Sequence, residues 1–288
     1  MKQIAFPDKH AVRRAFERSA ATYDASAVIH REVGQRLLEH LDPIRIEPSL
    51  VVDAGCGTGG TLEALSRRFP QATLAGVDLA HPMLLHARPR TPLWRRAVGY
   101  KVPHLVCGDA ERLPIATGAA GLVFSNLALQ WCHPGAFFAE AARVLPPGGL
   151  FIFSTFGPDT LRELRSAFTA AGAGQHVNAF ADMHDLGDAL VQAGFADPVM
   201  EMEVVTLEYR TVESLARDLK AVGATALPAR QRGLTGKALW KRMAERYESF
   251  RRDGALPATY EVVYGHAWKV APKRTADGRQ VIEFHPTP

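Results

Sequence analysis

Residues 51–60 read Val51-Val52-Asp53-Ala54-Gly55-Cys56-Gly57-Thr58-Gly59-Gly60, and this stretch decides the fold. It is typical of a buried strand that runs into a glycine-rich turn and then into a helix. The alternating glycines permit backbone angles that side chains forbid, and they let a ligand come close to the main chain. The stretch therefore predicts a loop that binds a large polar molecule.

Two classes of ligand fit this loop. Gly55, Gly57 and Gly60 satisfy the G-x-G-x-x-G pattern of dinucleotide sites, and Asp78 follows at a suitable distance for a ribose. However, Asp53 would place negative charge at the end of the strand, where it repels a pyrophosphate. An acid there suits a ligand with an ammonium group, and S-adenosylmethionine has one beside its sulfonium. The acid therefore favours S-adenosylmethionine over a dinucleotide.

Apolar runs alternate with helical patterns along the first half of the chain. This rhythm predicts an α/β fold of the Rossmann-like kind, a mostly parallel sheet with helices on both faces. Ligands of such sheets bind beyond the carboxyl ends of the strands, where Asp53, Asp78, Asp109 and Asn126 fall. The expected strands are Leu50–Asp53, Thr73–Asp78, Leu105–Asp109, Gly121–Ser125 and Gly149–Thr155.

The rest of the chain predicts additions to this core. Two further strands are expected at Met200–Tyr209 and Tyr260–Lys269, with a helical insertion between them. Two N-terminal helices, His10–Arg18 and Ala27–Leu41, join at Thr22-Tyr23-Asp24. We expect one domain over 1–271, with a cap (1–45), a cofactor-binding core (50–155), a lid (210–257) and a separate tail (272–288). The loop 88–103 is irregular and basic.

Composition is that of an ordinary folded protein. Among 288 residues, 47% are hydrophobic and 22% charged. No apolar stretch reaches bilayer length and no signal core precedes a cleavage site, so we expect a cytoplasmic protein without a membrane partner. The three cysteines lie far apart and lack metal-ligand spacing, so we expect reduced thiols and no metal.

Positive charge is concentrated in one segment. The net charge is +4, but residues 217–252 carry ten Lys or Arg residues against three acids. The segment is a candidate docking surface for an acidic partner, and a solvated helix surface explains it equally well.

The acids that end the next two strands suit the remainder of the cofactor. In Val77-Asp78-Leu79 the carboxylate accepts both ribose hydroxyls, since it can take two donors at once. In Cys107-Gly108-Asp109-Ala110 the acid accepts from the adenine amino group, while Ala110 offers its backbone N–H to a ring nitrogen. Each acid alone is equally typical of a helix N-cap, and their joint placement favours the binding role.

The chain resembles class I S-adenosylmethionine-dependent methyltransferases over about Leu50 to Thr155. The blocks that carry this resemblance are residues 53–59, Gly108-Asp109-Ala110-Glu111-Arg112-Leu113-Pro114 and Arg143-Val144-Leu145-Pro146-Pro147-Gly148-Gly149. Further blocks are similar to one family among them, the malonyl-acyl-carrier-protein O-methyltransferases of biotin synthesis. They lie at 16–24, 125–132, 153–161, 176–180, 217–220, 233–236 and 257–268.

This resemblance implies methyl transfer from S-adenosylmethionine to the free carboxylate of a malonyl thioester, giving a methyl ester and S-adenosylhomocysteine. The ester would prime pimeloyl synthesis. A carboxyl group of this kind is ionised at neutral pH, so no general base is required and neutral donors suffice to position it. The expected substrate-positioning residues are Tyr23, Gln130, Trp131, His176, Asn178, Tyr264 and His266. The expected cofactor-binding residues are Tyr23, Asp53, Gly55, Gly57, Gly59, Asp78, Leu79, Asp109, Ala110 and Asn126.

Plainer roles compete for several of these side chains. Tyr264, His266 and Trp268 alternate along a strand and would equally share one face packed against a helix. Gln130-Trp131 equally fits a helix start, and a lone His176 is more often structural. Tyr23 is the strongest candidate, because it joins two helices near the expected mouth of the cofactor site.

The resemblance also gives the basic segment a partner, since acyl carrier proteins are acidic and deliver a malonyl group on a phosphopantetheine arm. The carrier could equally be replaced by coenzyme A. Three rival functions remain: a small-molecule methyltransferase of the ubiquinone type, an RNA-binding or RNA-methylating protein, and a non-catalytic cofactor-binding regulator. The blocks 176–180 and 257–268 oppose the first rival. Little aromatic interleaving in the basic segment opposes nucleic acid as a partner.

Overall fold

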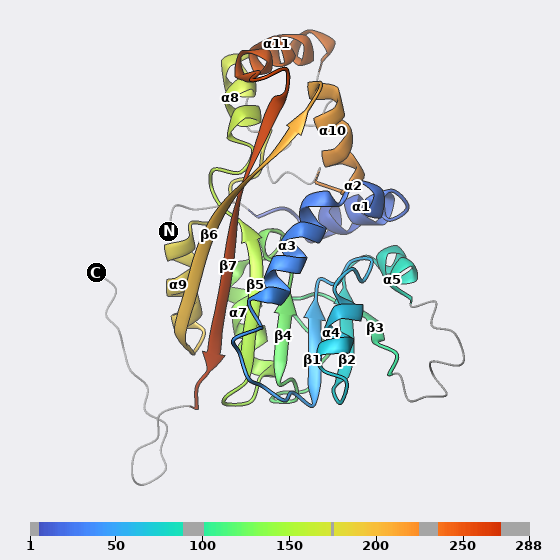
Figure 1. Ribbon diagram of the computed structural model, residues 1–288, viewed down its shortest axis with the longest axis vertical. Helices are drawn as coiled ribbons and strands as arrows, with labels where there is room; N and C mark the ends of the chain where they lie inside the picture. Colours follow the sequence, from blue (N-terminus) through green and yellow to red (C-terminus); the bar gives the residue numbers. More distant parts are fainter. Residues whose placement is uncertain (1–5, 89–100, 174–175, 225–235, 272–288) are drawn as a thin grey trace.

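A seven-stranded sheet organises the part of the chain that the structure, a computed structural model, describes: residues 6–88, 101–173, 176–224 and 236–271. The strand order is β3-β2-β1-β4-β5-β7-β6 (Figure 1). The first five strands are parallel, and β7 pairs antiparallel with both β5 and β6. The parallel strands are β1 (Leu50–Ala54), β2 (Thr73–Asp78), β3 (His104–Cys107), β4 (Leu122–Ser125) and β5 (Leu150–Phe156). The predicted α/β class is therefore confirmed.

Strand β1 lies at the centre of the parallel part, between β2 and β4. Val51 and Val52 are fully buried, as expected of a strand covered on both faces. The strand order reverses between β1 and β4, and the crevice beyond the carboxyl ends at such a point is where ligands of open α/β sheets bind. The quoted stretch thus ends in the most favourable position for a ligand.

Helices cover both faces of the sheet. On one face, α3 (Val28–Glu39) and α4 (Leu62–Arg68) bury Val33, Leu37 and Leu65 against β1 and β4. On the other face lie α7 (Pro134–Val144) and α9 (Met183–Gln192), with Phe137 and Phe138 against β5 (Figure 1). A short helix, α5 (His81–Ala87), follows β2. Each helix thus buries one apolar stripe and exposes its polar side.

The N-terminal segment folds over the carboxyl ends of the parallel strands (Figure 1). Asp8 caps α1 (Lys9–Ser19) by accepting from the backbone N–H of Ala11 at 2.9 Å. The predicted junction between the two N-terminal helices contains a short helix of its own, α2 (Tyr23–Ser26). It packs against α10 (Val212–Ala221), since the Thr22 hydroxyl donates to the carbonyl of Ala221.

The last two strands form a long hairpin that rises beyond the parallel sheet (Figure 1). They span β6 (Phe195–Tyr209) and β7 (Leu256–Lys269), so each begins several residues earlier than the sequence pattern predicted. Cross-strand pairing runs from Phe195↔Lys269 to Tyr209↔Leu256, with a register shift between Ala196 and Val199 in the first extension. The hairpin thereby holds α8 (Arg162–Ala170), α10, α11 (Lys237–Tyr247) and the 3₁₀ turn Glu248–Phe250 at its far end.

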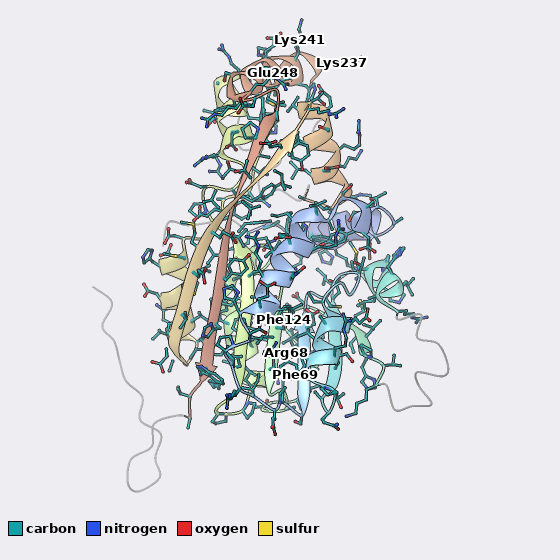
Figure 2. The ribbon with its side chains drawn as sticks, in the orientation of Figure 1. Arg68, Phe69, Phe124, Lys237, Lys241 and Glu248 are labelled. Atoms are coloured by element: carbon teal, nitrogen blue, oxygen red, sulfur yellow. The ribbon has the colours of Figure 1, made fainter. Side chains whose placement is uncertain are left out.

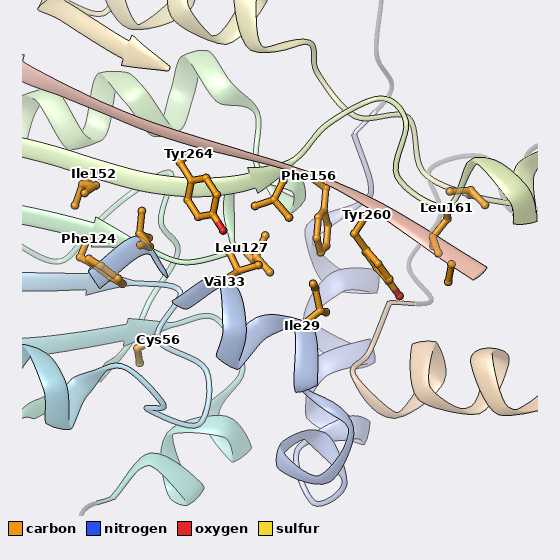
Figure 3. Packing of buried hydrophobic residues seen from close by; sticks show 14 of the residues in the cluster. Ile29, Val33, Cys56, Phe124, Leu127, Ile152, Phe156, Leu161, Tyr260 and Tyr264 are labelled. Atoms are coloured by element: carbon orange, nitrogen blue, oxygen red, sulfur yellow. The ribbon is translucent and has the colours of Figure 1, made fainter. Parts of the chain in front are cut away.

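A mixed aliphatic and aromatic cluster joins this upper part to the core. In Figure 3, Ile29 of α3 lies close to Phe156 of β5 and Tyr260 of β7. The rings of Phe156 and Tyr260 are 5.5 Å apart. No helix in the described ranges is long and apolar enough to span a bilayer. Most of the basic loop 88–103 and the tail 272–288 lie outside the described residues.

Candidate cofactor and substrate site

Three adjoining cavities meet beyond the carboxyl ends of the central strands. The first cavity has an empty volume of about 660 Å³, including space open to solvent, and is lined by Lys9, Asp78, Leu79, Asp109, Ala110 and Trp131 among others. The second cavity follows the glycine-rich loop and is lined by Asp24, Asp53, Thr58 and Thr61. The third cavity lies under α10 and is lined by Gln130, Trp131, His176, Asn178, Phe180 and Leu219.

Asp53 has the most unusual surroundings in the site. Its carboxyl group is 1% exposed, and Thr61 Oγ1 donates to its Oδ2 at 2.6 Å. Its Oδ1 is buried and has no hydrogen-bond partner within the part of the chain that the structure describes. Burial raises the pKa of this carboxyl to about 7, although the hydrogen bond from Thr61 opposes the shift. A buried acid with an unmet oxygen beside a cavity is a site for a cationic group such as an ammonium.

The glycines of the loop divide into those whose Cβ position is crowded by a neighbour and those with open space beside them. Gly55 has φ of +83°, and a side chain there would meet Ala128 Cβ at 2.3 Å. Gly59 (φ +80°) would press on Ala87, and its N–H donates to the carbonyl of Cys56. By contrast, a Cβ on Gly57 would meet no atom of the described residues within 4 Å, and Gly57 lines both the first and the second cavity. Gly57 therefore leaves space for a ligand.

Gly59 lines none of these three cavities. The structure gives Gly59 a role in the turn, and its contact with the cofactor stays a prediction. Asn126 does line the first two cavities, but its amide is already engaged. Its Nδ2 donates to the carbonyl of His30 at 2.9 Å, and its Oδ1 accepts from the hydroxyl of Ser154. Asn126 thereby anchors α3 to the ends of β4 and β5.

Asp78 is held by the backbone around it. Its two oxygens accept from the N–H groups of Gly57 at 2.9 Å and Ala80 at 2.8 Å. Burial raises its pKa above the usual range, and these two bonds oppose the shift. The carboxyl group is thus fixed in orientation at the edge of the first cavity, beside Leu79. This placement suits the recognition of ribose hydroxyls.

Asp109 and Ala110 also line the first cavity, and Lys9 of the N-terminal helix reaches Asp109. Lys9 Nζ lies 2.8 Å from Asp109 Oδ1, 2.9 Å from Glu111 Oε1 and 3.5 Å from the sulfur of Cys132. Burial acts to lower the pKa of Lys9, but Cys132 and the hydrogen bonds to Asp109 and Glu111 raise it overall. The ammonium of Lys9 thus ties α1 to the end of β3.

Tyr23 lines both the first and the second cavity, as its predicted role requires. The neighbouring Asp24 accepts from the hydroxyl of Thr58 at 2.6 Å, which links α2 directly to the glycine-rich loop. Burial, followed by the charges of Asp78 and Asp24, raises the pKa of Tyr23 above its ordinary value. The phenol is therefore protonated and available as a donor at neutral pH.

Four of the predicted substrate-positioning residues meet in the third cavity: Gln130, Trp131, His176 and Asn178. Gln130 is braced by Leu127 and Thr155, because its amide nitrogen donates to one and its oxygen accepts from the other. The ring of His176 stacks on Phe168 at 4.0 Å. Trp131 also lines the first cavity, so it stands where the two cavities join.

The structure does not bring Tyr264 and His266 to any of the three cavities. Tyr264 points from β7 toward α3 (Figure 3) and stacks on His40, with ring centroids 4.8 Å apart. His266 is further along β7, opposite Ile152 in the register. The plainer alternative, a strand face packed against a helix, describes Tyr264. The substrate-positioning roles of Tyr264 and His266 stay predictions.

Lys9 and His30 are among the cavity residues that the sequence did not predict. Lys9 begins the first helix and His30 lies in α3, and neither belongs to a motif with a spacing signal. His30 lines all three cavities. Only the way the N-terminal helices cross the strand ends brings them to the site. A sequence pattern carries no information on that crossing.

Comparison with known proteins agrees with this geometry. The family described as "Methyltransferase domain" matches residues 52–153. The malonyl-[acyl-carrier protein] O-methyltransferase of Gallionella capsiferriformans is 51% identical over 278 residues, covering 96% of each chain. The protein of the same name from Laribacter hongkongensis is 50% identical and covers 99% of each chain.

Among solved structures, the YcgJ protein of Bacillus subtilis shares the fold. Its TM-score is 0.58 at 14% identity, and the match covers 83% of this chain and 99% of the other. The two curated relatives extend over the N-terminal helices, the sheet and the hairpin alike. The chain therefore belongs to the malonyl-[acyl-carrier protein] O-methyltransferase family.

Proposed function

We propose that this protein transfers a methyl group from S-adenosylmethionine to the free carboxylate of a malonyl thioester on an acyl carrier protein. The observation that carries the proposal is the buried Oδ1 of Asp53 beside the glycine-rich loop, for which the described residues offer no hydrogen-bond partner. The names of relatives that are about half identical in sequence support the substrate. The methyl ester would then prime pimeloyl synthesis for biotin, as the family resemblance implies.

The residues around the first two cavities fit each part of the cofactor. Asp53 would hold the ammonium group, Asp78 the ribose hydroxyls, and Asp109 with the backbone of Ala110 the adenine. Gly57 leaves the room that the methionine portion needs. When bound, S-adenosylmethionine supplies the methyl group: a bond from the carboxylate oxygen to the methyl carbon forms as the carbon–sulfur bond breaks, and the electron pair stays on sulfur.

The third cavity would hold the malonyl group. Its carboxylate, with a pKa of roughly 4, is ionised at neutral pH, so no residue has to remove a proton. Gln130, Trp131 and Asn178 offer neutral donors, which position the carboxylate without pairing it with a full positive charge. Apolar neighbours such as Phe156 and Leu164 keep water away from the nucleophile. The protein would therefore act through orientation and solvent exclusion.

The basic segment supports carrier docking through its place beside the third cavity. Leu219, Val222 and Ala224, at the end of α10 and just after it, line this cavity, while Arg217 and Lys220 of the same helix are exposed. Lys237 and Lys241 of α11 project from the tip of the molecule (Figure 2). Arg230 and Arg232 lie outside the described residues. An acidic carrier on this surface would place its phosphopantetheine arm near the cavity mouth.

The placement of the added elements supports the predicted division of the chain. Residues 1–45 would cap the cofactor, residues 50–155 would bind it, and residues 210–257 would act as a lid over the acyl group. The hydrogen bond between Thr22 and the carbonyl of Ala221 links the cap to the lid. A movement of the cap would therefore displace the lid as well.

Incubation with labelled S-adenosylmethionine and malonyl-acyl carrier protein tests the proposal. We expect the carrier to gain the mass of one CH₂ unit, and an esterase to remove the gain. Acetyl-acyl carrier protein, which lacks the free carboxylate, is the control and should remain unlabelled. Label in RNA, or equal label in both carriers, would contradict carboxyl methylation.

A further inference from the structure

Among the described residues, His30 is the one that lines all three cavities. It lies in the first turns of α3. Tyr23 and Phe156 flank its ring, with centroids 5.4 Å and 6.4 Å away. It thus stands where the cofactor loop, the nucleotide space and the proposed acyl space meet.

The imidazole of His30 has an unmet hydrogen-bonding atom. Its Nδ1 is buried and has no partner among the described residues. Burial, followed by the charge of Arg31, lowers the pKa of His30 to about 4, so the ring is neutral at physiological pH. A neutral imidazole carries one N–H donor and one acceptor nitrogen. A buried polar atom of this kind is costly unless a ligand satisfies it.

The backbone at His30 is held in place independently of the ring. Its carbonyl accepts from Asn126 Nδ2 at 2.9 Å, and Ser154 in turn donates to Asn126 at 2.8 Å. These contacts fix α3 on the ends of β4 and β5. The ring is therefore presented from a rigid support, as a group that positions a substrate should be.

We propose that His30 donates a hydrogen bond from Nδ1 to the malonyl carboxylate at the junction of the first and third cavities. This inference rests on the proposed function and adds a substrate-positioning residue to it. Trp131 lines the same two cavities, so an imidazole and an indole flank the junction. Both are neutral donors, and they hold one carboxylate oxygen while the other keeps its negative charge for attack.

Three substitutions distinguish a hydrogen bond from Nδ1 of His30 from the packing of the whole imidazole ring. In His30→Asn the amide nitrogen is bonded to Cγ, as Nδ1 is in histidine. In His30→Gln the amide nitrogen lies one atom further out, at the place of Nε2. His30→Leu removes both. Each variant is titrated with malonyl-CoA and with acetyl-CoA in the presence of S-adenosylhomocysteine, and with S-adenosylhomocysteine alone.

We expect the wild-type protein to bind malonyl-CoA more tightly than acetyl-CoA. That preference, and kcat/KM for malonyl-acyl carrier protein, should fall about 10- to 100-fold in His30→Leu and His30→Gln, as for a lost hydrogen bond to a charged group. His30→Asn should retain most of both. The dissociation constant for S-adenosylhomocysteine should stay close to the wild-type value in all three variants.

Equal weakening of both thioesters would overturn the inference, because it indicates a general loss of structure. Weaker S-adenosylhomocysteine binding with an unchanged preference would overturn it too, by assigning His30 to the cofactor. If the wild-type protein methylates malonyl thioesters and the three variants do so equally well, the role of His30 is wrong while the proposed function stands. A wild-type protein that leaves malonyl thioesters unmethylated would instead remove the proposed function, and this inference with it.

Discussion

Thr61 Oγ1 donates a 2.6 Å hydrogen bond to Asp53 Oδ2, while Oδ1 of the same buried carboxyl has no hydrogen-bond partner in the described ranges of the chain. Only one of the two oxygens of this carboxyl therefore has a hydrogen bond from the described residues. Thr61 follows the glycine-rich loop and Asp53 precedes it, so the bond closes the loop around the second cavity. The unmet oxygen makes the ligand-free protein less stable than a neutral residue would, and this cost is recovered when a cation binds.

Asp53→Asn should therefore stabilise the ligand-free protein at high pH. The folded-state pKa of Asp53 is about 7 against 3.8 in the unfolded chain, so the folded state favours the protonated carboxyl. The resulting loss of stability is absent below about pH 4, grows as pH rises, and is complete above about pH 7. The amide of the variant does not ionise, so the variant escapes this loss.

Urea unfolding of both proteins at pH 8 and at pH 4.5 measures this effect. We expect a gain on the order of 3 kcal/mol for Asp53→Asn at pH 8 and a far smaller difference at pH 4.5. S-adenosylhomocysteine should bind the variant at least about tenfold more weakly. A variant that is less stable at pH 8, or that binds the ligand normally, would contradict the assignment of Asp53.

Cofactor binding should itself depend on pH in the same range. Because Asp53 must be ionised to pair with an ammonium, protonation competes with binding below its pKa of about 7. The dissociation constant for S-adenosylhomocysteine should rise toward about tenfold per pH unit as pH falls below 7, and level off above it. Calorimetry at pH 6.5 in two buffers of different ionisation enthalpy should show proton release on binding. Proton uptake would have the wrong sign.

Gly57→Ala should weaken ligand binding more than it weakens the fold. Gly57 has φ of +53°, so alanine costs about 1–2 kcal/mol of stability, but its methyl group would point into open space. Gly148→Ala is the matched control, since Gly148 has φ of +81°, also with nothing within 4 Å, at the opposite end of the sheet. Both variants should lose similar stability in urea. Only Gly57→Ala should raise the dissociation constant for S-adenosylhomocysteine. If both variants bind this ligand equally well, the ligand does not come close to the backbone at Gly57.

Lys9→Met should destabilise the cap on the strand ends. Lys9 is partly buried and bonded to both Asp109 and Glu111, whereas Arg13 of the same helix forms an exposed pair with Glu17. Exposed pairs of this kind contribute little to stability, whereas charged hydrogen bonds in partly buried sites contribute about 1.5–3 kcal/mol. Unfolding free energies of Lys9→Met and Arg13→Met should differ accordingly. Equal losses would show that Lys9 does not hold α1 in place.

Charge reversal on α11 should impair the carrier-bound substrate selectively. Lys237→Glu with Lys241→Glu changes two exposed side chains at the tip (Figure 2) and spares Arg242, which donates to the carbonyl of Ala171. We expect KM for malonyl-acyl carrier protein to rise about tenfold at low salt, and KM for malonyl-CoA to change little. Arg45→Glu with Lys101→Glu, exposed residues away from this surface, is the charge control. Equal effects on both thioesters would remove carrier docking from α11.

The sequence predicted the part of the fold that depends on local pattern. Strand Thr73–Asp78 was placed to the residue, because an apolar run ends in an acid there, and the acids at 53, 78 and 109 do line the cavities. The outcome for Tyr264 was different. Alternation along β7 shows which residues share a face. It does not show that Tyr264 on this face stacks on His40, which caps the C-terminus of α3.

Local sequence patterns could not predict the residues that reach the cavities only through tertiary packing. His30 was expected only as part of a helix over Ala27–Leu41, and its place between three cavities depends on how α3 crosses the sheet. Asn126 was expected to touch the cofactor, yet its amide anchors that same helix. Both outcomes follow from tertiary contacts between segments about a hundred residues apart.

Calorimetric titration of the purified protein with S-adenosylhomocysteine and, separately, with NADH tests the central assignment most directly. A cleft built around Asp53 should bind S-adenosylhomocysteine with one site per chain and give no heat with NADH, because the acid repels a diphosphate. Saturable NADH binding, with no heat from S-adenosylhomocysteine, would contradict the account.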